Sequence, residues 1–166
     1  MYLADQKRDK ALENYDKILK LDPNDGFVHL SIANYYLEGN DSIKAFEHIK
    51  LAFRNSLLEF ETKAQMYLLL IKPGASKISD KLQYELLHIL IDSHIDDDRP
   101  RALMVDYYQG KKQLEEARKQ IRLVLDMKKD NYQYWERLLL INNDLMDWST
   151  MDADCKKALE YFPMQY

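Results

Sequence analysis

Cysteine, glycine and proline are all scarce in this chain of 166 residues. The single cysteine, Cys155, excludes an internal disulfide and a zinc site built from several cysteines. Four glycines and four prolines leave no room for long flexible linkers. The longest purely apolar run, Met66 to Ile71, is far shorter than the roughly 20 residues that a membrane-spanning helix needs. The sequence therefore predicts one compact, soluble body with no membrane insertion.

The charge balance is close to neutral, with 24 basic and 28 acidic residues and a net charge of −4. So small an imbalance argues against a nucleic-acid partner, which would need a basic surface. The first residues, Met1-Tyr2-Leu3-Ala4-Asp5, lack the basic region and apolar stretch of a signal peptide. Together with the lone cysteine, this favours the cytoplasm and leaves the periplasm as the alternative.

Residues suited to catalysis or metal binding do not gather into a motif. The four histidines are scattered, no serine or cysteine lies in a nucleophile motif, and no glycine-rich phosphate loop is present. The segment from Asp92 to Asp98 combines four aspartates with a histidine. Such a cluster can hold a divalent cation, but it also suits the end of one helix and the acidic cap of the next. We favour the caps, and we expect no enzyme activity, no cofactor and no metal.

What the chain does contain is a repeat with a period of about 34 residues. Ala11 and Ala45 lie one such period apart, and each begins an apolar pattern with helical spacing. A later unit opens with Trp135 and Leu138 and carries Ala158 in the same register. Recurrence at this period is typical of stacked helix pairs.

The pattern resembles the tetratricopeptide-repeat family, whose 34-residue unit follows W-x₂-L-G-x₂-Y, then A-x₃-F, then a closing proline. The resemblance covers essentially the whole chain. It implies an all-α fold, an α-solenoid in which antiparallel helix pairs stack into a right-handed superhelix. Small residues such as Ala45 are expected where the two helices of a pair approach closely, and Cys155 is expected to be a buried structural thiol.

The register divides the chain into a partial unit over residues 1–25 and full units over 26–59, 60–97, 98–131 and 132–165, which we read as a fragment of a longer protein. The partial unit is expected to be a helical stub followed by a second helix from about Asp9 to Leu21. Large residues replace small ones in the unit 60–97, which predicts more widely spaced helices. Tyr36 and Tyr108 lie two periods plus four residues apart. We assign that insertion to the turn near residues 72–76, where proline and glycine end a helix.

The resemblance also implies a ligand surface on the first helix of each unit, on the side that faces away from the second helix. The register places twelve side chains there: Phe27, Leu30, Asn34, Leu37, Ala64, Gln65, Leu68, Arg99, Ala102, Asp106, Glu136 and Arg137. Family members that bind chaperone tails carry a clamp of Lys, Asn, Asn, Lys and Arg, and only Asn34 and Arg99 match it here. A free C-terminal carboxylate is therefore not the expected ligand. The lining suits an amphipathic helix or an extended peptide with a few apolar anchors.

Two functions stay open at this point. The first is a protein–protein interaction scaffold that binds a peptide, a helix or a protein surface in the concave groove. The second is an architectural or regulatory segment of a larger multidomain protein, which associates with its own flanking parts or with itself. Apolar faces at the two ends, around Leu12 and Leu19 and along the last helix, predict a weak homodimer. The identity of the partner does not follow from the sequence.

Overall fold

The structure is a computed structural model that describes residues 2–72 and 78–164, with side chains from residue 10 onward. Over these ranges it is helical and contains no strand. The helices are α1 (Tyr2–Leu21), α2 (Gly26–Glu38), α3 (Ser42–Arg54), α4 (Phe60–Ile71), α5 (Asp80–Ser93), α6 (Arg99–Gly110), α7 (Leu114–Met127), α8 (Tyr132–Asp144) and α9 (Trp148–Tyr161). They form two compact units, Met1–His94 with α1 to α5 and Ile95–Tyr166 with α6 to α9. We call α2, α4, α6 and α8 first helices, and the other five second helices.

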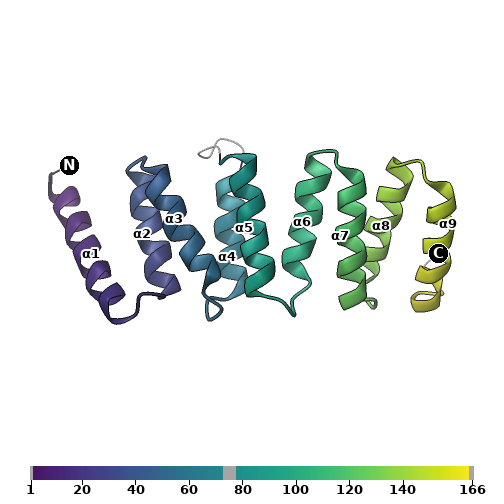
Figure 1. Ribbon diagram of the computed structural model, residues 1–166, viewed down its shortest axis with the longest axis horizontal. Helices are drawn as coiled ribbons and strands as arrows, with labels where there is room; N and C mark the ends of the chain where they lie inside the picture. Colours follow the sequence, from purple (N-terminus) through teal and green to yellow (C-terminus); the bar gives the residue numbers. More distant parts are fainter. Residues whose placement is uncertain (1, 73–77, 165–166) are drawn as a thin grey trace. The chain divides into compact units, whose positions relative to one another are not determined.

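Helices α2 and α3 form the closest pair in the first unit (Figure 1). Asp25 and Asp41 cap them, because each carboxylate accepts a hydrogen bond from the backbone N–H three residues later. The turn between the helices falls at Gly39 to Asp41, and Asn40 adopts the left-handed conformation there with a φ of 59°. Local signals in the sequence thus determine where both helices begin and end.

Small side chains line the contact between α2 and α3. Ala33, Ala45 and Ala52 are fully buried, as is the much larger Phe53 of α3. The sequence predicted this packing role for Ala45. A larger residue at this position would have to displace closely packed neighbours.

Ala45→Leu is therefore expected to lower the free energy of unfolding by about 1–3 kcal/mol, because the added carbon atoms have no space in the contact. Urea unfolding followed by circular dichroism measures the change. Ala153→Leu is the matched control, since Ala153 is an exposed residue in the middle of α9. Equal stability of the two variants would contradict the packing role of Ala45.

Helix α1 corrects one expectation. The repeat register predicted a helical stub before a second helix that starts near Asp9, but α1 is continuous from Tyr2 to Leu21. Asp5 and Gln6 occupy the register of the turn residues Gly39 and Asn40, so the glycine of that turn is missing from the first unit. The missing glycine does not by itself account for the continuous helix, since the turn between α8 and α9 at Leu145 and Met146 also lacks a glycine.

The pair α4 and α5 is looser than the pair α2 and α3, as the large residues in this part of the sequence predict. Helix α4 begins at the first residue of the predicted unit 60–97, and Ser79 caps α5 by accepting a hydrogen bond from the N–H of Leu82 at 3.2 Å. Helix α5 packs mainly against α3. The proposed insertion near residues 72–76 lies almost wholly outside the described residues, so it stays a prediction.

In the second unit, α6, α7, α8 and α9 contribute buried residues to a shared apolar core. Trp135 and Leu138, which the sequence places in the repeat's Trp and Leu positions, are both buried in it. The fully buried members contributed by α6, α7, α8 and α9 include Val105, Ala117, Ile121, Val124, Ile141 and Ala158. The turns α6–α7 and α8–α9 place Lys112 and Met146 in the left-handed region, in the same register as Asn40. The turn conformation thus repeats although its residue type does not.

The start of α6 differs in detail from the expected cap. Asp98 occupies the N-cap position, but its side chain makes no capping hydrogen bond and instead accepts one from the Tyr134 hydroxyl of α8. Asp97 accepts the hydrogen bond from the Arg99 N–H, at 3.0 Å. Burial, followed by the hydrogen bond to Asp98, raises the pKa of Tyr134 well above its usual value. One aspartate therefore caps the helix while the other ties α6 to α8.

Candidate interaction site

On α2, the predicted ligand residues divide into exposed and buried ones. Phe27 and Asn34 are exposed and Leu37 is half-buried, so all three offer some surface to a partner. Leu30 is only 8% exposed and belongs to the packed interior of the first unit. The structure therefore corrects the expected exposure of Leu30. The helical register alone does not distinguish a groove residue from one that a neighbouring helix covers.

On α4, two predicted residues lie at a hollow. Gln65 and Leu68 are exposed, and together with Leu69 and Lys72 they line a depression of about 410 Å³. Ala64, one turn before Leu68, is half-buried. Leu68 and Leu69 are 50% and 61% exposed, which makes this the most apolar open part of a first helix in the first unit. Leu69 was not among the predicted residues. Its position next to Leu68, which was predicted, is the only signal in the sequence that could have identified it.

On α6 and α8, the predicted residues are polar and partly paired with each other. Arg137 of α8 forms an ion pair with Asp106 of α6, and its Nε also donates to Oε1 of Gln109 at 2.8 Å. The structure thus brings together Asp106 and Arg137, two residues that the register assigned to the same surface. Arg99 binds Asp97, Ala102 is half-buried and Glu136 is exposed. The predicted residues on α6 and α8 are thus mostly polar, whereas α4 exposes two adjacent leucines.

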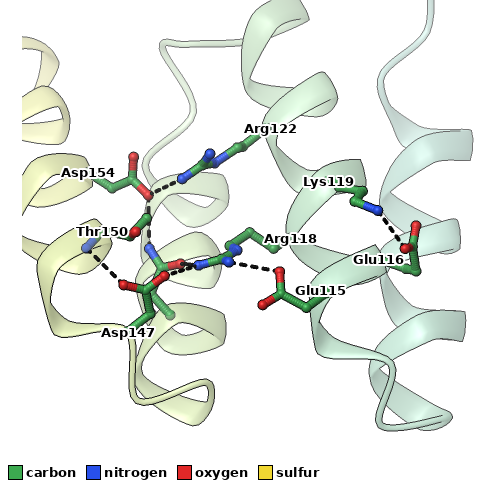
Figure 2. Close-up of polar contacts among 9 residues, drawn as sticks. Glu115, Glu116, Arg118, Lys119, Arg122, Asp147, Thr150 and Asp154 are labelled. Atoms are coloured by element: carbon green, nitrogen blue, oxygen red, sulfur yellow. Dashed lines mark hydrogen bonds and ion pairs between the residues drawn. The ribbon is translucent and has the colours of Figure 1, made fainter.

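A buried polar network joins α7 to α8 and α9, and no motif in the sequence indicated it. Asp154 of α9 is only 4% exposed, and its Oδ2 accepts hydrogen bonds from Nδ2 of Asn142 and from the guanidinium of Arg122, both at 2.9 Å. Asn142 itself is fully buried. Figure 2 shows Arg122 reaching from α7 to Asp154 on α9. The network therefore holds successive second helices together through the first helix between them.

Arg118 extends this network toward the turn before α9 (Figure 2). Its guanidinium donates to Oδ2 of Asp147 at 2.7 Å, to Oε2 of Glu115 at 2.7 Å and to Oδ1 of Asn142 at 3.3 Å. The hydrogen bond from Arg118, followed by those from Thr150, lowers the pKa of Asp147 to about 2. Asp147 also caps α9, so one carboxylate fixes both the helix end and the position of α7.

Beside this network, a hollow of about 460 Å³ opens between α7 and α9. Its floor is apolar, with Trp135 and Leu138 of α8, and Tyr161 stacks on the Trp135 ring at a centroid distance of 5.7 Å. Its rim carries both signs of charge, from Arg122, Asp126, Lys129, Lys157 and Glu160. Protein–protein interfaces in general combine an apolar core with a polar rim.

The acidic segment that could have held a cation has other contacts. His94 Nε2 lies 2.8 Å from Nζ of Lys63, within hydrogen-bond distance. Asp97 forms an ion pair with Arg99, and Asp98 accepts a hydrogen bond from the Tyr134 hydroxyl. Among the residues that the structure describes, no group of three His, Cys, Asp or Glu side chains is placed to hold a metal. The same residues contain no helix long and apolar enough to cross a membrane.

Lys63 of α4 is the most unusual charged group of the first unit. Its side chain is fully buried, and Nζ contacts Ser93 Oγ at 3.2 Å and His94 Nε2, with no carboxylate partner among the residues that the structure describes. Burial lowers the pKa of Lys63 from 10.5 to about 8. The side chain is enclosed, so it offers no accessible amine to a ligand.

Comparison with known proteins relates the chain to others through structure alone. Scans of protein-family models and of curated proteins find no match. Among solved structures, MamA is similar with a TM-score of 0.56 and 16% identity, covering 95% of this chain and 84% of that one. MamA 41-end from Desulfovibrio magneticus RS-1 has a TM-score of 0.53 and 19% identity, covering 98% and 90%. YrrB, described as a TPR protein with an unusual peptide-binding site, has a TM-score of 0.54 and 18% identity, covering 98% and 81%.

These likenesses show the fold. The chain has a tetratricopeptide-like fold, an all-α helical repeat in which helix pairs follow one another along the sequence. The expected resemblance is confirmed at this level. At identities of 16% to 19%, the likeness carries no residue roles from those proteins to this one.

Proposed function

We propose that the protein is a protein–protein interaction scaffold that binds a peptide or helix of its partner on the exposed face of its first helices. The observation that carries this proposal is the hollow on α4, where Leu68 and Leu69 present open apolar surface beside the polar ends of Gln65 and Lys72. Exposed leucines in a hollow are the kind of site that takes an apolar anchor residue. The proposal assigns no catalytic step and no cofactor to the chain.

Charge and polarity on the other first helices fit the same role. In the second unit, the ion pair of Arg137 with Asp106 and the exposed Glu136 give that surface polar contacts of both signs. Apolar contacts supply most of the binding energy at such interfaces, whereas charged groups determine orientation and choice of partner. The description of YrrB as a peptide-binding TPR protein supports a peptide ligand for this fold.

The test is site-specific photocrosslinking followed by titration. A benzophenone amino acid at position 68 is expected to crosslink to the partner, whereas the same group at position 43 is not, because Ile43 is even more open to solvent than Leu68 but lies on the second helix α3. The identified partner should then bind Leu68→Glu at least tenfold more weakly than wild type, and Ile43→Glu within twofold. A Leu30 variant is unsuitable, because a buried carboxylate would damage the fold.

Two outcomes would overturn the proposal. If positions 68 and 43 crosslink equally, or if Leu68→Glu binds as well as wild type, the binding surface is not the face of α4. If position 68 crosslinks only to another segment of the same polypeptide, the chain has the architectural role instead. Unfolding curves of Leu68→Glu and Ile43→Glu should both match wild type, because Leu68 and Ile43 are both exposed.

A further inference from the structure

All four histidines of the chain belong to the first unit, and two of them contact each other. Histidine is the side chain that ordinarily changes charge between pH 5 and 8. The single thiol, that of Cys155, lies in the second unit and is half-buried, which corrects its expected place in the interior. A response of the fold to mild acid through histidine must therefore begin in the first unit.

The two histidines in contact are His29 of α2 and His48 of α3. His29 is only 3% exposed, and His48 is half-buried. Their Nδ1 atoms lie 3.0 Å apart, and Nε2 of His29 lies 3.0 Å from the carbonyl oxygen of Pro23. The ring of Tyr36 stacks on His48 at a centroid distance of 5.9 Å. These contacts, which we call the histidine clamp, join the α1–α2 turn to α2 and α3.

The partners of the two rings determine which nitrogens carry hydrogen. A carbonyl oxygen can only accept, so Nε2 of His29 must donate to Pro23. A neutral imidazole has a single N–H, so Nδ1 of neutral His29 can only accept. Nδ1 of His48 must therefore donate to it, which leaves Nε2 as the unprotonated nitrogen of neutral His48.

We propose that the histidine clamp is an acid-sensitive contact between α2 and α3, which holds with one added proton and breaks with two. A first proton can enter at Nε2 of His48, because Nδ1–H of the same ring still donates to His29. A second proton has only Nδ1 of His29 left, and two N–H groups would then face each other. The second charge would also lie in an enclosed place, because His29 is buried.

The surrounding charges do not remove this restriction. Asp16 of α1 and Glu47 of α3 favour a charged His48, but burial, followed by the charge of His29, outweighs them and lowers the pKa of His48. Among the residues with described side chains, no carboxylate forms a hydrogen bond with either ring. Other charged groups on the packed elements have partners of their own: Asp22 and Asp25 with backbone N–H groups of the turn and of α2, Lys44 with Asp41, and Glu85 of α5 with Lys50.

The restriction makes the stability of the first unit depend on pH. The unfolded chain takes up both protons as the pH falls below about 6.5, the ordinary pKa of histidine. The folded chain takes up one at most, so its stability falls as the pH falls. One withheld proton lowers the ratio of folded to unfolded protein about tenfold for each pH unit below that value. The lowered pKa of His48 acts in the same direction.

Urea unfolding of the whole chain between pH 7 and 5 tests the clamp, with His48→Asn as the variant. The asparagine amide can donate Nδ2–H to neutral His29, and after rotation its oxygen can accept from protonated His29. The variant therefore admits the proton that the wild type excludes. Between pH 7 and 5, the ratio of folded to unfolded protein should fall roughly tenfold more in the wild type than in His48→Asn.

His88→Asn is the matched control, because His88 is exposed on α5 and lies outside the clamp. This chain should keep the wild-type dependence on pH. His94 is unchanged in all three chains, so its contact with Lys63 contributes equally to each. Equal pH dependence of the wild type and His48→Asn would overturn the proposal, and so would a His88→Asn chain that loses the dependence to the same extent.

Nitrogen NMR of the wild-type protein at about pH 7.5 tests the same contacts without any substitution. The ¹⁵N chemical shifts distinguish protonated from unprotonated imidazole nitrogens. We expect the hydrogen on Nε2 of His29 and on Nδ1 of His48. If His48 carries its hydrogen on Nε2 instead, the two Nδ1 atoms share no hydrogen bond and the proposal is wrong. This measurement decides the question even if His48→Asn does not fold. The inference concerns the stability of the first unit and does not rest on the binding surface proposed on α4.

Discussion

Replacing Lys63 with methionine is expected to raise the free energy of unfolding by about 2 kcal/mol at pH 7, because an enclosed ammonium without a carboxylate partner is costly to bury. Methionine has a similar length and fills the same space between α4 and α5. Part of the gain is lost because His94 Nε2 gives up its contact with Nζ. Urea unfolding at constant pH measures the difference. Lys81→Met, at an exposed position on α5, is the control and should change stability little.

The dependence on pH gives an independent check of the same prediction. The folded pKa of Lys63 is about 8, against 10.5 for the ordinary side chain, so the unfolded chain binds more protons between these values. The wild-type free energy of unfolding should therefore rise as the pH increases from about 8 to 10.5, and the full penalty applies below pH 8. In Lys63→Met this rise should be absent. If both proteins show the same dependence in that interval, Lys63 is not the group responsible.

The second large effect is expected at Asp154. Asp154→Ala should lower the free energy of unfolding by about 3 kcal/mol, because it leaves the buried amide of Asn142 without an acceptor and removes the partner of Arg122. Asp154→Asn should cost less, since an amide oxygen can still accept from Asn142. Guanidinium or urea unfolding of the second unit, followed through Trp135, provides the measurement.

Asp152→Ala is the matched control for Asp154→Ala. Both aspartates belong to α9 and both form an ion pair, but the pair of Asp152 with Lys156 is exposed on both sides. Exposed pairs of this kind contribute at most about 0.5 kcal/mol. Equal costs for the two substitutions would mean that burial of Asp154 does not determine the strength of its network.

Most of the fold can be predicted from the 34-residue repeat period and from the residues that cap the helices. The range of α4, the turn at Gly39 and the capping role of Asp25 all follow from residues within a few positions of each other. Helix α1 shows the limit of the repeat register as a guide, because the turn that follows α2, α6 and α8 is absent from the middle of α1. The left-handed residues Lys112 and Met146 show the converse, since the turn conformation persists without a residue that favours it.

Much less of the candidate site could be anticipated. The helical register placed Leu68, Asp106 and Arg137 on the exposed side of the first helices, where the structure also has them. It placed Leu30 there as well, but Leu30 is buried. Whether a side chain on a first helix is open depends on how closely the neighbouring helix approaches. That distance is set by packing between residues far apart in the sequence.

The sequence by itself determined that the chain is a series of antiparallel helix pairs, because each repeat carries its own caps, turns and small contact residues and packs mainly on its neighbours. Only the tertiary structure decided which polar groups are enclosed together. Lys63 meets His94 from 31 positions away, and Asp154 meets Arg122 from 32. The sequence does not reveal these partners. A polar pair becomes buried only when the surrounding helices exclude water from it and hold the two groups in contact, and both conditions depend on the packed helices.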